Sequence, residues 1–145
     1  MRHRSLFPVI ITPALTEARD FYVRHLGFRL VFAAEWYVHL HAPRVDGGVP
    51  LELAFMSPDL NSQPCPLRSA FNGQGMIVTI EVDDVDALYQ KLRETGCEII
   101  IDLQDEPWGQ RHFLLRDPSG MLLDVVRQIP PSSEYVLAYA DYIKE

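Results

Sequence analysis

The sequence has few of the residues that build disulfide frameworks and zinc sites. Among its 145 residues only Cys65 and Cys97 are cysteines; they form no CxxC spacing and have no histidine nearby at the spacing of a zinc site. We therefore interpret both as free, partly buried thiols of a reducing compartment. A cytoplasmic location is the default expectation that follows.

Long apolar runs and clustered basic residues are also missing. Residues 1–14 include basic side chains but only a short apolar run between Pro8 and Pro13, which predicts a strand rather than a signal peptide or a membrane span. The formal net charge of -7 argues against a nucleic-acid-binding surface, which needs clustered Lys and Arg. The same charge permits a neutral or cationic ligand.

The residues that are present predict one folded domain over residues 1–145. Hydrophobic residues make up 48% of the chain, which is enough for a core. The first half has the pattern of a strand, a helix between Pro13 and Gly27, and three further strands. These strands are expected at 7–12, 28–34, 35–42 and 49–55.

The second half repeats this order of elements. Strands are expected at 75–82, 97–102, 110–116 and 120–126, and a helix at 83–96 with Asp83 or Asp84 as its cap. We predict an α+β fold of two tandem β-α-β-β-β modules, residues 5–56 and 75–128, joined by a Pro/Ser/Asn/Gly-rich linker at 57–74. Such modules can form a curved mixed sheet with a concave ligand cavity.

The C-terminal tail, residues 129–145, follows the second module. Its apolar and aromatic side chains suit a short helix that covers a sheet edge or a partner chain. These residues are Tyr135, Val136, Leu137, Tyr139 and Tyr142.

Three stretches carry a family resemblance: "ARDFYVRHLGFRLVF", "VDDVDALYQKLRETGCEI" and "EPWGQRHFLLRDPSGMLLDVV". They resemble the vicinal-oxygen-chelate superfamily, which includes glyoxalase I, extradiol dioxygenases, and fosfomycin- and bleomycin-resistance proteins. The resemblance covers roughly residues 6 to 128. It is specific for the fold and only loosely specific for function, because this fold hosts many chemistries.

In metal-dependent members of this superfamily, four strand positions supply the ligands, usually His, Glu, His and Glu. The resemblance places these positions at Phe7, Glu52, Ile77 and Asp124. Phenylalanine and isoleucine have no donor atom, and two carboxylates alone make a poor transition-metal site. The resemblance therefore favours the metal-free branch, with no cofactor and no catalytic residue.

Bleomycin-resistance proteins represent that branch, and the likeness extends to two tryptophans. Trp36 opens the strand before "LEL", and Trp108 lies in "PWGQR" before "DPSG". Proteins of this kind are acidic homodimers that sequester a drug. The resemblance thus implies a homodimer that holds an aromatic or cationic small molecule.

Strand alternation predicts which side chains share the face of Asp124. A simple hairpin across "DPSG" pairs Arg116 with Met121 and places Arg111 and Phe113 on that face, with His112 pointing away. One bulge would invert this assignment. The expected ligand-binding residues are Phe7, Trp36, Glu52, Ile77, Trp108, Arg111, Phe113 and Asp124.

Each of these residues also has a structural interpretation. Phe7, Ile77 and the tryptophans can be packing residues, Glu52 and Asp124 solvated strand residues, and Arg111 a partner of Asp124.

Three functional hypotheses therefore stay open. The first is the metal-free binding protein. The second is a glyoxalase- or dioxygenase-like enzyme, a lyase, isomerase or oxidoreductase, with an altered metal site that uses Glu52, Asp124 and His39 or His112. A metal-free catalyst with Glu52 or Asp124 as general base is its variant. The third is a partner-binding dimer whose cavity is vestigial.

Overall fold

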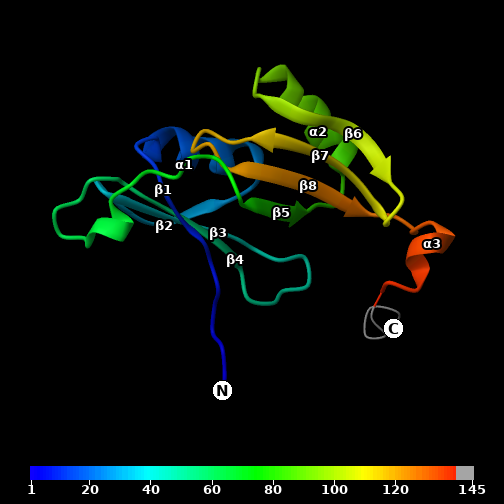
Figure 1. The fold of residues 1–145 in the computed structure, drawn as a ribbon, viewed down its shortest axis with the longest axis horizontal. Coiled ribbons are helices and arrows are strands. Elements are labelled where there is room, and N and C mark those ends of the chain that lie inside the picture. The colour runs from blue at the N-terminus through cyan, green and yellow to red at the C-terminus, as the bar shows by residue number, and fades with distance from the viewer. Residues whose placement is uncertain (140–145) are drawn as a thin grey trace. The chain divides into compact units, whose positions relative to one another are not determined.

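The structure is a computed structural model that describes residues 1–139. The first half contains five elements, drawn in blue to green in Figure 1: β1 (Val9–Ile11), α1 (Leu15–His25), β2 (Arg29–Ala34), β3 (Tyr37–Ala42) and β4 (Leu51–Met56). The second half contains β5 (Ile77–Glu81), α2 (Val85–Glu94), β6 (Ile99–Glu106), β7 (Gln110–Arg116) and β8 (Leu122–Gln128).

Each half forms its own four-stranded mixed sheet with the same topology. The strand order is β1-β4-β3-β2 in the first sheet and β5-β8-β7-β6 in the second. The first strand of each half pairs in parallel with the last, and the other pairs are antiparallel. The predicted α+β fold with two β-α-β-β-β repeats is confirmed.

Two short helical segments lie outside these sheets. A 3-10 turn, η1 (Cys65–Leu67), lies between the two halves, and α3 (Ser133–Val136) follows β8. The short helix expected in the tail is therefore present, whereas Tyr142 lies outside the described residues. Among residues 1–139, no helix is long and apolar enough to cross a membrane.

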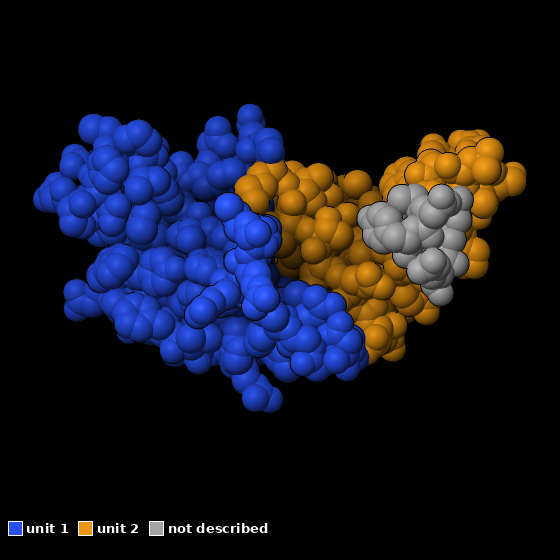
Figure 2. All heavy atoms as spheres, turned by 90° about the horizontal axis from the view of Figure 1, so that it is seen from below, with its two compact units in different colours: residues 1–75, 117–121 blue, residues 76–116, 122–145 orange. Residues whose placement is uncertain are grey.

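The chain divides into two compact units, coloured in Figure 2. The first unit contains residues 1–75 together with 117–121, and the second contains 76–116 and the chain from residue 122 onward. The turn between β7 and β8 thus belongs to the first unit, although it lies far along the sequence.

In both sheets, a helix covers one face and buries the residues of that face, and some residues of the opposite face, such as Ala54 and Leu114, are buried too. In the first unit, Ala18 and Tyr22 of α1 are buried, as are Leu40 of β3 and Phe55 of β4. We call the opposite face of each sheet its open face.

In the second unit, a helix likewise covers one face of the sheet. Asp84 begins α2 by accepting a hydrogen bond from the N–H of Ala87 at 2.9 Å, which fixes the cap among the two predicted aspartates. The Tyr89 ring of α2 lies 5.1 Å from the Phe113 ring of β7, centroid to centroid, and Phe113 is fully buried.

The hairpin between β7 and β8 differs from the prediction by one residue. The N–H of Asp117 donates to the carbonyl of Met121 at 2.9 Å, so the loop holds three residues rather than four. Gly120 closes this loop with φ 86°, a left-handed conformation that glycine adopts without strain. Arg116 therefore pairs with Leu122 and not with Met121.

This shift exchanges the two faces of β7, because strand side chains alternate. Leu114, not Phe113, pairs with Asp124. The prediction that Arg111 and Phe113 share the face of Asp124 is wrong, and so is the prediction that His112 points away from it.

The same turn is tied to α1 through a buried carboxylate. Asp117 is 4% exposed, and its Oδ2 accepts a hydrogen bond from the Tyr22 hydroxyl at 2.6 Å. Its Oδ1 accepts from the Ser119 N–H, the Ser119 hydroxyl and the Met121 N–H at 2.8, 2.6 and 3.0 Å. Burial, followed by the charge of Asp117 and its hydrogen bond, raises the pKa of Tyr22.

Candidate functional site

On the open face of the first sheet, a histidine and a carboxylate lie in contact. Nε2 of His39 on β3 is 3.0 Å from Oε1 of Glu52 on β4, and both side chains are mostly buried. Glu52 lies directly across from His41, so His39 reaches it diagonally. The Phe7 ring packs against the other side of this pair, with its centroid 4.6 Å from that of His39.

Further aromatic rings lie on β2, on β3 and in the turn that joins them. The Tyr37 ring centroid is 6.2 Å from Phe32, 5.4 Å from Trp36 and 6.3 Å from His39. Burial raises the pKa of Tyr37, and the negative charge of Glu52 adds to this. The first sheet therefore presents a row of aromatic rings beside a carboxylate.

The open face of the second sheet has a related arrangement built around His112. Nδ1 of this buried histidine lies 2.7 Å from Oδ1 of Asp124, and its Nε2 lies 3.0 Å from Oε1 of Glu106. His112 and Asp124 lie on the third and fourth strands of their module, as His39 and Glu52 do in the first. The duplication thus places a histidine against a carboxylate twice.

The two contacts of His112 indicate its charge state. An ionised carboxylate only accepts hydrogen bonds. A ring that bonds ionised carboxylates through both nitrogens must therefore donate from both, which requires the doubly protonated, positively charged form of histidine. Burial by itself lowers the pKa of His112, but the hydrogen bonds to Glu106 and Asp124 and their charges outweigh it and raise the pKa. Hydrogen bonds from Gln104 and His112 in turn lower the pKa of Glu106.

Trp108 lies at the end of this polar row, in the loop between β6 and β7. Its ring centroid is 6.2 Å from that of His112, and the rings meet edge to face at 75°. The indole N–H donates to Oε1 of Gln110 at 2.9 Å. The residue is 40% exposed, so a large aromatic surface faces outward next to a charged group.

Two expected site residues have other partners. The guanidinium of Arg111 binds Asp86 of α2 at 2.8 Å and Asp105 at 2.8 Å, and these bonds raise its pKa. Arg111 therefore does not neutralise Asp124. Phe113 belongs to the core between the second sheet and α2.

Two further expected residues lie at the surface of their units. Ile77 pairs with Leu122 and Thr79 with Asp124, so Ile77 and Asp124 share the open face of the second sheet. Ile77 is exposed, and so is Trp36 at the β2–β3 turn.

Sequence reasoning missed how closely the histidines bind the carboxylates. The spacing of His39 and His41 on one strand was visible in the sequence, and the correct hairpin register would have brought His112 to Asp124. Nothing in the sequence indicated that Glu106 contacts His112, because this contact depends on the path of β6.

The residues do not fit the metal site that the resemblance implies. Phe7 and Ile77 offer no donor atom, and within each unit of the described chain no group of three His, Cys, Asp or Glu side chains is arranged to hold a metal ion. Glu106 and Asp124 contact opposite edges of the His112 ring, so the three cannot converge on one ion.

Comparisons with known proteins agree with the topology. A protein of Mycobacterium bovis described only as uncharacterised is 28% identical over 125 residues, covering 80% of this chain and 78% of its own. A bleomycin resistance protein of Geobacillus stearothermophilus is 26% identical over 125 residues, covering 84% and 95%. A crystal structure of a glyoxalase/bleomycin resistance protein/dioxygenase from Nocardioides superposes with a TM-score of 0.69 at 21% identity, covering 89% and 85%.

A family model decides the classification. It matches residues 6–125, nearly the whole of both modules. The chain belongs to the Glyoxalase/Bleomycin resistance protein/Dioxygenase superfamily.

Proposed function

We propose that this protein binds and sequesters a small aromatic or cationic molecule without the help of a metal. The observation that carries this proposal is the pairing of aromatic rings with acidic groups on the open face of each sheet. On the first sheet Tyr37 lies close to Glu52 and contacts Trp36, and on the second Trp108 contacts His112, which binds Asp124.

The charges favour a cation over an anion. Two carboxylates surround the single positive charge of His112, so this cluster keeps a net negative charge. An exposed tryptophan attracts cations through its ring face, and a nearby carboxylate adds to that attraction. The formal charge of -7 acts in the same direction over longer distances.

The relatives also support the proposed binding of a small molecule. The bleomycin resistance protein of G. stearothermophilus matches most of both chains, and its name gives bleomycin as a first ligand to test. We propose, as for that branch of the superfamily, a homodimer in the cytoplasm.

Thermal shift and calorimetric titration with a small panel test the proposal. The panel contains bleomycin and the planar cation ethidium, with the aromatic anion naphthalenesulfonate as a charge control. A cation present at 100 times its dissociation constant is expected to stabilise the fold by about 2.7 kcal/mol. A naphthalenesulfonate shift that equals the shifts of the cations contradicts the assigned charge preference.

The acidic group of the first sheet is expected to contribute directly. Glu52→Gln keeps the shape of the side chain and removes its charge, so we expect the dissociation constant of the bound cation to rise about tenfold, which corresponds to ~1.4 kcal/mol. Glu94→Gln, on the exposed end of the helix that covers the other face of the second sheet, removes the same charge and serves as the control. Equal loss of affinity in the two variants would mean that only net charge matters.

A metal-free acid–base catalyst is the second candidate. It is favoured by His112, whose ring nitrogens each face a carboxylate and can transfer a proton to a bound molecule. Chromatography of the ligand after prolonged incubation separates the two functions. A sequestering protein returns the ligand unchanged, whereas a catalyst returns a product.

A further inference from the structure

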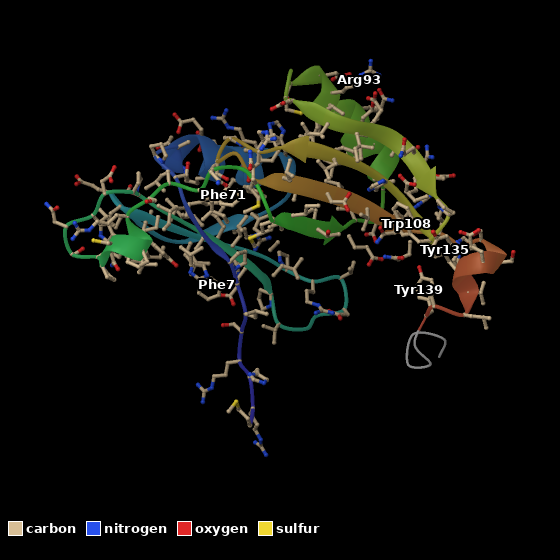
Figure 3. The ribbon with its side chains drawn as sticks, viewed as in Figure 1. Phe7, Phe71, Arg93, Trp108, Tyr135 and Tyr139 are labelled. Carbon is tan, nitrogen blue, oxygen red and sulfur yellow. The ribbon has the colours of Figure 1, made fainter. Side chains whose placement is uncertain are left out.

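The loop that carries Trp108 is held from outside by the C-terminal segment. Three consecutive carbonyl groups of this loop each accept a hydrogen bond from that segment. The N–H of Ser132 donates to Pro107 at 2.8 Å, the N–H of Ile129 donates to Gly109 at 2.9 Å, and the hydroxyl of Tyr139 donates to Trp108. Figure 3 shows Trp108 and Tyr139 beside one another at this end of the second sheet.

The C-terminal segment packs tightly against Gly109 of the Trp108 loop. Gly109 has φ 106°, and its N–H closes the tight turn by donating to the carbonyl of Glu106 at 3.0 Å. A Cβ atom at Gly109 would lie 2.8 Å from the Tyr139 hydroxyl and 2.9 Å from the Ile129 carbonyl oxygen. Only glycine lets the tail approach the loop this closely.

The main chain of the loop determines where the indole lies. The Trp108 carbonyl is fixed by Tyr139, and the indole N–H is fixed by Gln110. Together these bonds hold the ring edge to face with His112, which in turn binds Asp124. A continuous chain of contacts therefore runs from the tail to the acidic group of the second open face.

We propose that residues 129–139 of the C-terminal tail support the ligand site from outside, and that Tyr139 is a positioning residue that sets the place of Trp108. This inference rests on the proposed binding function. The tail then determines ligand affinity without touching the ligand, because it fixes the aromatic surface beside Asp124. The segment that extends beyond the duplicated modules thereby acquires a role in binding.

Fluorescence is measured on the full chain with Trp36→Phe, so that Trp108 is its only tryptophan, and ethidium binding is measured on the full chain that retains Trp36. Tyr139→Phe removes the hydroxyl and keeps the ring. We expect acrylamide to quench Trp108 emission about twice as strongly in this variant, and the dissociation constant for ethidium to rise about fivefold, the effect of losing one hydrogen bond. Circular dichroism checks that the fold is unchanged.

Two further variants make the test independent of any one substitution. Tyr135→Phe removes a hydroxyl of the neighbouring helix that makes no hydrogen bond to any residue among 1–139, and it is expected to change neither measurement. Gly109→Ala pushes against the Tyr139 hydroxyl from the opposite side and is expected to act like Tyr139→Phe. In the double variant, the dissociation constant should rise by less than the product of the increases caused by Gly109→Ala and Tyr139→Phe separately.

The two readouts distinguish the two proposals. Unchanged quenching of Trp108 in both Tyr139→Phe and Gly109→Ala would overturn the positioning role, whatever the ligand results show. A change in Trp108 quenching with no binding of any cation by the wild-type protein would instead support the positioning contact and contradict the binding function.

Discussion

Replacing Asp117 with alanine is expected to lower the free energy of unfolding by about 3–5 kcal/mol, near the upper end for a single substitution. The carboxylate is 4% exposed and accepts four hydrogen bonds. Its loss leaves the Tyr22 hydroxyl and the N–H groups of Ser119 and Met121 without an acceptor, and each such buried group costs about 1–3 kcal/mol. Urea denaturation followed by circular dichroism measures the change.

Two variants separate this network from an ordinary loss of charge. Tyr22→Phe removes only one of the four hydrogen bonds and is expected to cost about 1 kcal/mol. Asp46→Ala removes an exposed, solvent-screened ion pair with Arg44 and is expected to leave the free energy of unfolding almost unchanged. A loss below about 1 kcal/mol for Asp117→Ala would show that the turn does not depend on this carboxylate.

The second large effect is the dependence of stability on pH through His112. The pKa of this histidine is raised in the folded state above its ordinary value of 6.5. The stabilisation is therefore fully present below about pH 6.5 and is lost as the pH rises through the folded pKa. We expect the free energy of unfolding to fall over this range in the wild-type protein and much less in His112→Gln.

His112→Gln is also expected to lose about 2–3 kcal/mol at pH 6, because it removes the charge of the ring that bonds both Glu106 and Asp124. His3→Gln, at the exposed N-terminus, is the matched control and is expected to retain the wild-type profile. Urea unfolding at intervals between about pH 6 and pH 8.5 makes the measurement, over a range in which carboxylates change little. Parallel wild-type and His112→Gln profiles would contradict the protonated state assigned to His112.

The order of elements was predictable because both modules carry strong local signals. Strands were predicted from alternating apolar residues, helices from apolar residues at helical spacing, and helix ends from glycines. Each of these patterns involves residues that are close together in the sequence. Asp84 as a helix cap illustrates this, since its partner Ala87 is only three residues away. The family resemblance then placed Glu52 and Asp124 on equivalent strands.

The details of the second open face were not predictable because they depend on one residue of register. Reading "DPSG" as a four-residue loop placed Phe113 opposite Asp124, whereas the three-residue loop brings His112 to it. The partners of Arg111 lie on α2 and β6, and no local pattern names them. The contact of Tyr139 with the Trp108 loop joins residues 31 positions apart and was equally invisible.

The central claim is that aromatic rings beside carboxylates make each open face a site for an aromatic cation. Isothermal titration of the full chain with the cation panel, against naphthalenesulfonate, tests it most directly. We predict saturable binding of a cation, at least tenfold weaker binding of the anion, and an approximately tenfold loss of cation affinity in Glu52→Gln. Binding of no panel cation, or cation binding that is equal in the wild type and in Glu52→Gln, would contradict the account.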